Sequence, residues 1–464
     1  MKRIAIGMTK RAFKYDMQRG LGSCVLELQS TQDIEKYRPL VLWGCSRDMA
    51  YDAQCEGCRS VYLYRLITQF PDSVPFMDVL EKRLFHSMRS RGWEFLQDCE
   101  ILSYFALDGE KRAWNILQSC YRELLQILYR KRKHTKDGLP DNFESLCLTL
   151  VTMQPGMYKM LVNDIGLLIE GNSLYSAADF TWFQSVSKSE LGEKAVRRIL
   201  HHPDADEGIR AYARSMEEVR ERWERESAER KKSEPETADE IYERLRGGGD
   251  DGRIYRWLAR RMMSRGRSQE VAALAEYYRK EEEPDLRYQL LLMLSDKSCV
   301  WSLDIERLIA DSRSDNGDLA EWAFEALSYI RDTRVREYAY ELLHDKNKQA
   351  QAVSMLAANY EDGDREVFVH AVKQIPVTFE DVEWHGVFGD VMDLFSGPAK
   401  RKPKELLLYM YRNTLCSYCR ERVVREMGRR RMLTRELLEE MQYDCNEEIG
   451  AYAERRLHKV SYGK

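Results

Sequence analysis

One short pattern occurs three times in this chain, and it constrains the fold more than any other feature. Each copy begins with a branched apolar residue, continues with a Tyr-Ala pair three residues later, and reaches another apolar residue three or four positions further on. The copies span 209–216, 335–342 and 449–457. Each follows a turn with acidic residues or asparagine, which commonly cap helix N-termini. Such repetition is typical of stacked helical repeats.

The rest of the sequence favours the same architecture. Apolar residues recur at spacings of three and four, whereas the sustained alternation that marks strands is almost absent. Only 11 residues are proline, and this scarcity permits long helices, because proline removes a donor and clashes inside a helix. One short segment, 22–28, fits a strand as well as a helix. We therefore predict an all-α protein.

Two changes in composition divide the chain into parts. A polar helix is expected over 217–232, where Glu and Arg residues lie four apart, and a glycine-rich stretch follows at 247–252. The length of 464 residues also exceeds what one compact core usually accommodates. We predict an N-terminal helical-repeat domain over 1–230, a charged and glycine-rich linker over 231–252, and a C-terminal repeat domain over 253–464.

The second copy of the pattern resembles a known family of helical repeats. Its sequence from Asp332 to Ala339 is Asp-Thr-Arg-Val-Arg-Glu-Tyr-Ala. The second helix of a HEAT repeat typically opens with Asp, then Val-Arg, then a small Ala, and the helices at Ile209 and Ile449 are related to it. The chain is thus similar to HEAT-repeat proteins and their armadillo-like relatives.

The resemblance covers 280–460 well and 35–215 loosely. It departs from the family pattern at Gly450, which replaces the arginine, and across 375–400, where the period breaks. The resemblance implies a HEAT-like α-solenoid of stacked antiparallel helix pairs in two segments. It implies a fold and not one activity.

The composition restricts the classes of function that remain. The formal net charge is −4, so the chain as a whole has no electrostatic preference for nucleic acid. No window approaches the roughly 18 to 20 apolar residues of a membrane helix, and the N-terminal apolar run is too short for a signal peptide. Eleven cysteines in such a chain suggest reduced thiols. We expect a cytoplasmic protein without a membrane partner.

The common motifs of catalysis are missing from the sequence. It contains no phosphate-binding Gly-x-x-x-x-Gly-Lys-[Ser/Thr], no Gly-x-Gly-x-x-Gly, no Gly-x-Ser-x-Gly and no His-Glu-x-x-His. We therefore assign no catalytic residue and no cofactor. The sequence favours a non-catalytic scaffold or adaptor that holds a protein partner on its helical surface.

Two arginine-rich clusters are the candidate partner-binding residues. They are Arg253, Arg256, Trp257, Arg260 and Arg261 in the first cluster, and Arg429, Arg430 and Arg431 in the second. Arginine and tryptophan carry much of the energy of protein interfaces. The same residue types also suit phosphates and stacked bases. Nucleic-acid binding, as in HEAT-like DNA glycosylases, is therefore the alternative, although no catalytic aspartate of that family can be placed here.

A carboxylate row offers a candidate polar surface site. Asp48, Asp52 and Glu56 are spaced by four residues, which places them on one face of an expected helix, and Arg59 follows. Such a row can bind a cation or act in acid–base chemistry. It can equally be a solvated helix start, where acidic residues are common. We select Asp52, Glu56 and Arg59 as the candidate residues.

The cysteine pairs are weak candidates for metal ligands. Cys55 and Cys58 have Cys-x-x-Cys spacing and Cys45 lies ten residues earlier, while Cys416 and Cys419 form a second pair. Thiolates are strong zinc ligands. However, no histidine flanks the pairs at finger spacing, and residues three apart on a helix also share a packing face. We therefore assign no metal.

Overall fold

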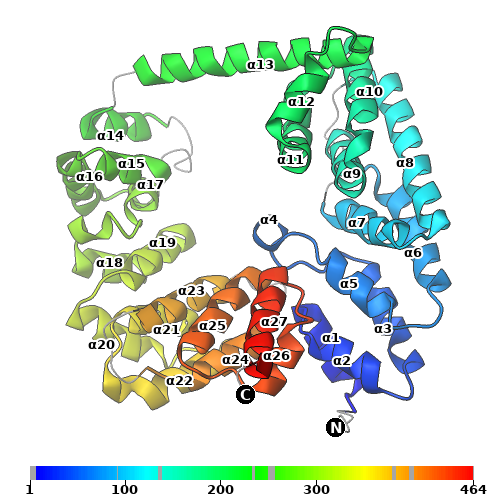
Figure 1. Cartoon of the computed structure of the whole chain (residues 1–464). Coiled ribbons are helices and arrows are strands. Elements are labelled where there is room, and N and C mark those ends of the chain that lie inside the picture. Colours follow the sequence, from blue (N-terminus) through cyan, green and yellow to red (C-terminus); the bar gives the residue numbers. More distant parts are fainter. Residues whose placement is uncertain are drawn as a thin grey trace. The chain divides into compact units, whose positions relative to one another are not determined.

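The described part of the chain is entirely helical. The computed structural model describes residues 7–90, 92–133, 138–232, 236–248, 256–378, 383–396 and 402–462. These residues form α-helices and a few short 3-10 turns, and they contain no strand (Figure 1). The prediction of an all-α protein is confirmed, and the ambiguous segment 22–28 lies almost wholly in a helix, α2 (Ser23–Ser30). None of the described helices is both long enough and apolar enough to span a membrane.

The helices form two compact units. Unit 1 consists of Met1–Ser233, Cys416–Tyr418 and Leu433–Lys464, and unit 2 consists of Glu234–Leu415 and Cys419–Met432. The division near residue 233 lies close to the predicted domain boundary. The last segment of unit 1 differs from the prediction, which assigned it to the C-terminal domain.

Unit 1 is built from two rows of helices. Its helices are α1 (Lys10–Arg19), α2 (Ser23–Ser30), α3 (Arg38–Cys45), α4 (Ala53–Glu56), α5 (Ser60–Ile67), α6 (Val74–Ser87), α7 (Glu94–Leu107), α8 (Lys111–Arg130), α9 (Leu139–Met153), α10 (Tyr158–Gly171), α11 (Thr181–Leu191), α12 (Glu193–Leu200), α13 (Glu207–Lys232), α26 (Arg435–Met441) and α27 (Glu447–Tyr462). Helices α5, α7, α9 and α11 pack in succession and form one row. Helices α6, α8, α10 and α13 form the other.

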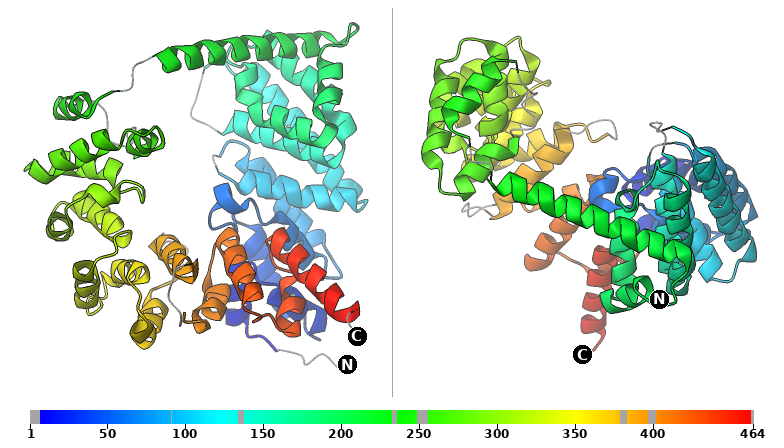
Figure 2. Two further views of the ribbon diagram at one scale, coloured as in Figure 1. Left: turned by 60° about the vertical axis from the view of Figure 1, so that its left-hand side comes forward. Right: turned by 90° about the horizontal axis from the view of Figure 1, so that it is seen from above.

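The longest helix of unit 1 shows why the two rows pack closely. Helix α13 carries the first copy of the repeated pattern, with Ile209 and Tyr212 fully buried. It lies against α10 at two glycines, since a Cβ added to Gly166 would stand 1.7 Å from the carbonyl oxygen of Gly208. Figure 2 shows the second half of α13 projecting beyond the other helices of this unit, and the side chains of 220–228 are exposed.

The C-terminal helices α26 and α27 pack on the N-terminal helices of the same unit (Figure 1). The Cys445 backbone N–H donates to the Gly20 carbonyl at 2.8 Å. A Cβ on Gly22 would stand 1.9 Å from the carbonyl oxygen of Glu440, so the two backbones touch. The third copy of the repeated pattern lies on α27, which packs against α26, and its Ile449 and Ala453 are buried.

Unit 2 repeats the two-row arrangement. Its helices are α14 (Ala238–Arg246), α15 (Arg256–Ser264), α16 (Ser268–Lys280), α17 (Pro284–Leu294), α18 (Ile305–Asp311), α19 (Gly317–Ser328), α20 (Thr333–Leu342), α21 (Gln349–Ala358), α22 (Arg365–Gln374), α23 (Glu383–Ser396), α24 (Glu405–Asn413) and most of α25 (Ser417–Arg429). Helices α15, α17, α19, α21 and α23 pack in succession, while α16, α18, α20 and α22 each pack against this row.

Two local features of unit 2 bear on the predictions. Helix α20 carries the second copy of the pattern; the Asp332 side chain caps its first turn, and Val335 and Tyr338 are buried. Helix α14 lies inside the predicted linker 231–252, where Thr237 and Glu240 form a reciprocal capping box. Part of that segment is therefore an ordinary packed helix.

Candidate functional site

The predicted polar surface site is largely buried. Helix α4 begins only at Ala53, and Asp52 is its N-cap, accepting a hydrogen bond from the Cys55 backbone N–H. The expected helix face through Asp48 therefore does not form. The side chains of Glu56 and Arg59 are 0% and 2% exposed, so the description as a surface site is wrong for both.

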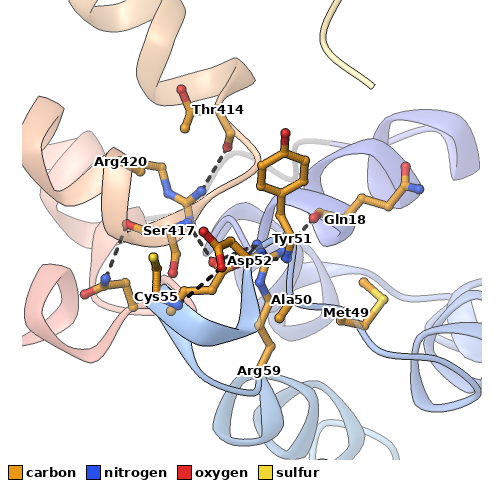
Figure 3. A network of polar contacts seen from close by, with 12 residues as sticks. Gln18, Met49, Ala50, Tyr51, Asp52, Cys55, Arg59, Thr414, Ser417 and Arg420 are labelled. Carbon is orange, nitrogen blue, oxygen red and sulfur yellow. Dashed lines mark hydrogen bonds and ion pairs between the residues drawn. The ribbon is translucent and has the colours of Figure 1, made fainter. Parts of the chain in front are cut away.

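Glu56 and Arg59 instead belong to a buried polar network, in which Figure 3 shows Arg59 near Gln18 and Ser417. The side chains of Glu56 and Arg59 pair at 3.0 Å, and the Arg59 guanidinium donates to the Gln18 carbonyl at 2.6 Å. The Ser417 backbone N–H donates to Glu56 at 2.7 Å, and Asn446 donates to the Ser417 carbonyl at 3.3 Å. The network thus joins segments of unit 1 that are remote in sequence, and its role is structural.

The protonation of Glu56 reflects two opposing effects. Burial alone would raise its pKa, because the charged form loses solvation. The charge of Arg59 and the hydrogen bonds from Ser417 and Asp52 outweigh burial, and the pKa ends below the ordinary glutamate value. Glu56 is therefore an ionised structural partner at neutral pH and is poorly suited to proton transfer.

The arginine-rich clusters are only partly described. Arg253 lies outside the described residues, and the side chains of Arg256 and Trp257 in α15 are also outside them. Arg260 and Arg261 are exposed on α15.

The second cluster is partly paired within its own helix region. Arg429 and Arg430 both pair with the buried carboxylate of Glu426, and the distance from Arg430 is 2.7 Å. Arg431 is exposed and has a positive φ of 58° at the end of α25.

The weak metal candidates lie in different environments. Cys45 is buried and Cys55 is exposed, while the Cys58 thiol lies 3.7 Å from the Trp93 carbonyl oxygen. Burial raises the pKa of the Cys45 and Cys58 thiols, which disfavours the thiolate that a metal needs. Within the described residues, none of these three joins a group of three or more metal-capable side chains.

A large cavity lies elsewhere in unit 1, on the row formed by α7, α9 and α11. Its volume is about 750 Å³, within the usual range of ligand sites. We call it the acidic pocket. Its lining includes three carboxylates and three aromatic rings: Glu100, Asp141 and Glu144, here called the pocket carboxylates, and Trp93, Tyr104 and Trp182, here called the pocket aromatics.

The helical period explains why these residues converge. On α7 the lining residues are Leu96, Glu100, Ser103, Tyr104 and Leu107, spaced by three or four so that they share one stripe. Helices α9 and α11 present similar stripes, with Asp141, Glu144, Ser145, Leu148 and Thr152 on α9 and with Trp182 and Val186 on α11. The three helices pack side by side, so their stripes face a common space.

Hydrogen bonds hold two of the pocket carboxylates in place. Glu144 accepts from the Phe183 backbone N–H at 2.9 Å, and Glu100 accepts from the Ser60 hydroxyl at 2.7 Å. Burial is the main cause that raises the pKa of Glu144 to about 7; the backbone donors oppose the rise, and the charge of Asp141 contributes to it. Burial also raises the pKa of Glu100. Carboxylates with such shifts cluster at functional sites.

The pocket also exposes apolar surface. Trp182 is 61% exposed and Leu107 is 58% exposed, the two highest values among large apolar side chains in the described part of the chain. Clustered exposed apolar side chains with polar neighbours commonly mark interaction sites. No lysine, arginine or histidine is among the described residues that line the pocket.

A second polar cleft occurs in unit 2, and its charges are balanced internally. Two adjoining cavities of about 480 and 350 Å³ share Lys297, Tyr329, Asp390 and Asp393. Asp393 pairs with Lys297 at 3.1 Å and with Arg422 at 3.4 Å. Burial raises the pKa of Asp390 to about 7. Cations therefore already lie beside the carboxylates of this cleft, whereas the described lining of the acidic pocket contains carboxylates without a neighbouring cation.

None of the residues that line the acidic pocket is among the site residues predicted from the sequence. Each of its stripes looks like an ordinary solvated helix face, and only the packing of three helices brings them together. A usable signal was present in the segment Thr-Trp-Phe-Gln-Ser, where two adjacent aromatic residues cannot both face the core of one helix, so that Trp182 is left for the surface.

Comparison with known proteins leaves the site to be interpreted from its geometry. No protein-family model matches the chain. A search of curated proteins also finds no match.

Proposed function

We propose that this chain is a non-catalytic adaptor that holds a protein partner, and that the partner binds at the acidic pocket. The observation that carries the proposal is the pocket of about 750 Å³ with exposed Trp182 and Leu107 in its lining. Protein interfaces are enriched in exposed aromatic anchors surrounded by polar groups.

The finer architecture belongs to the same proposal. We propose a HEAT-like, armadillo-like solenoid in each unit, because both units contain a row of successively packed helices with other helices covering it. Two copies of the repeated pattern, on α13 and α20, lie in the covering rows. Solenoids bind partners along the surface of one row, and the acidic pocket lies on such a row. The 11 cysteines suggest a reducing compartment, such as the cytoplasm.

Nucleic acid is the weaker candidate partner. The pocket carboxylates would repel a phosphate backbone, whose contacts require lysine and arginine. Arg429 and Arg430 are also already paired with Glu426. Fewer arginines of the second cluster are therefore free to bind phosphates than the sequence of that cluster suggests.

Site-specific photo-crosslinking tests the proposed function. A benzophenone amino acid would replace Trp182 in the full chain, expressed in its own cells, and cross-linked proteins would be identified by mass spectrometry. The matched control is the same replacement at Trp223, which is 52% exposed on the projecting half of α13. We expect one protein to cross-link at Trp182 and not at Trp223. No adduct at Trp182, or the same set of adducts at both positions, would contradict the proposal.

A further inference from the structure

We infer that the acidic pocket binds an arginine or lysine side chain from a basic segment of the partner. This inference rests on the proposed function, because it specifies the chemistry of the protein partner at the same pocket. The pocket carboxylates would pair with the cation, and the pocket aromatics would cover it. Three observations carry the argument: the sign of the lining charge, the fixed positions of two of the carboxylates and the exposed aromatic surface.

The charge of the lining selects a cation. Three carboxylates face the pocket, and none of the described lining residues is basic. In unit 2, by contrast, Asp393 in the polar cleft is paired with Lys297 and Arg422. The described lining of the acidic pocket contains no such cation, so a cationic occupant would supply the complementary charge. An anionic occupant would be repelled, and a neutral one would leave the carboxylates uncompensated.

Two of the three pocket carboxylates, Glu144 and Glu100, are held by hydrogen bonds before any ligand binds. The Phe183 backbone N–H anchors Glu144 from α11, and the Ser60 hydroxyl anchors Glu100 from α5. The burial that raises the pKa of Glu144 to about 7 leaves its charge poorly solvated, and a bound cation supplies the compensation that water does not. Fixed, desolvated acceptors favour charge-assisted hydrogen bonds.

The aromatic rings in the lining favour an organic cation carried by a polypeptide over an inorganic cation. Tryptophan and tyrosine faces attract guanidinium and ammonium groups. Leu107 and Val186 lie in the lining with Trp182 and offer apolar contact to the methylene stem and to neighbouring residues of a peptide. The volume of about 750 Å³ exceeds what one small inorganic cation requires. A basic segment of a protein accounts for charge, rings and apolar surface together.

The test compares a charged peptide with a neutral peptide of the same shape. The probe is acetyl-Leu-Arg-Leu-amide, and its control carries citrulline, in which an uncharged oxygen replaces one guanidinium nitrogen. All nine tryptophans would be replaced by 5-fluorotryptophan, and the Trp182 resonance would be assigned with Trp182→Phe. We expect the arginine peptide, and a lysine analogue, to shift this resonance with a Kd of about 1 mM. The citrulline peptide should bind ~10-fold more weakly or not at all.

A matched pair of variants assigns the effect to the pocket. Glu144→Gln keeps an oxygen for the Phe183 N–H and should weaken the arginine peptide ~10-fold. Glu123→Gln, on the exposed side of α8, should leave the affinity unchanged. Equal affinity for the arginine and citrulline peptides, no loss in Glu144→Gln, or no saturable shift with any peptide overturns the inference. Cross-linking at Trp182 that persists undiminished in Glu144→Gln would leave the adaptor proposal standing while the cation inference fails.

Discussion

Two buried carboxyl groups of unit 1, Glu56 and Asp98, contribute to stability in opposite ways. Glu56 has a charged partner and several donors, and its pKa is lowered. Asp98 is fully buried, has Arg83 at 3.4 Å, and neither of its carboxylate oxygens accepts a hydrogen bond. Burial raises the pKa of Asp98 to about 8, although Arg83 opposes the shift. The two carboxylates should therefore respond differently to neutralisation and to pH.

Glu56→Gln should destabilise the protein strongly. The substitution leaves the Arg59 charge buried without its partner, and breaking a buried ion pair costs about 3–5 kcal/mol of unfolding free energy. Because the folded-state pKa of Glu56 is lowered, its contribution is present above the ordinary glutamate pKa and is lost as the pH falls through the folded value. Denaturant titrations between pH 3 and pH 7 (about one unit apart) measure both effects.

The control for this experiment is an exposed pair with the same spacing. Glu35 and Arg38 are also three residues apart, but the Glu35 side chain is 54% exposed. Glu35→Gln should cost much less stability than Glu56→Gln, because a solvent-exposed ion pair contributes little. Equal losses of unfolding free energy in the two variants would show that the buried network of Glu56 stabilises the protein no more than an exposed ion pair does.

Asp98→Asn should have the opposite effect at alkaline pH. The folded-state pKa is raised, so the folded protein retains a proton that the unfolded chain releases, and stability falls as the pH rises from about 4 to about 8. Asparagine removes this dependence and should raise the unfolding free energy at pH 8 by about 1–3 kcal/mol, because a charged carboxylate without hydrogen bonds is costlier to bury than a neutral amide. Arg83 keeps a hydrogen bond to the Cys45 carbonyl. A variant less stable than the parent at pH 8 would show that the Arg83 pair dominates.

At the scale of elements, sequence patterns predicted helices well and their surroundings poorly. The repeated pattern marked the buried starts of α13, α20 and α27, because 3.6-residue periodicity is a local property. The same reasoning failed at 48–56, where the N-cap Asp52 and the C-cap Gly57 limit α4 to four residues. The network of Glu56 could not be predicted, since its donor Ser417 lies 361 residues away. The acidic pocket also depends on how α7, α9 and α11 stack.

The contact between α10 and α13 yields a prediction at this scale. Gly166→Ala should lower the unfolding free energy by about 1–3 kcal/mol, the usual cost of overpacking, because its Cβ would stand 1.7 Å from the Gly208 carbonyl oxygen. This loss should outweigh the gain of about 1 kcal/mol in helix propensity. Gly389 in α23 has no atom within 4 Å of the same position, so Gly389→Ala should be neutral or stabilising. Thermal unfolding of both variants tests whether close backbone packing, rather than helix propensity, decides whether each substitution lowers or raises the unfolding free energy.

At the scale of the whole chain, the last helices complete the unit that the first helices begin. Leu433–Lys464 belongs to unit 1, although nearly 200 residues of unit 2 separate it from Ser233. The Cys445 N–H to the Gly20 carbonyl, and Asn446 to the Ser417 carbonyl, are among the bonds that hold it. Closing so long a loop costs entropy, but the cost grows only slowly with loop length. Contacts between the chain ends should therefore be cooperative, with each end protecting the other.

Gly22→Ala tests this coupling directly. A Cβ at this position would stand 1.9 Å from the Glu440 carbonyl oxygen, so α2 and the end of α26 must separate. Hydrogen exchange should then show reduced amide protection in α26 and α27 together with α1 and α2, while amides of unit 2 such as those of α19 and α21 keep theirs. Gly156→Ala, where no atom lies within 4 Å of the added carbon, is the control in the same unit. If amide protection is lost only in α2 while α26 and α27 keep theirs, the C-terminal helices are held independently of the N-terminal helices. Loss of protection in α1 and α2 together with α26 and α27 is expected only if these two segments unfold as one cooperative part of unit 1.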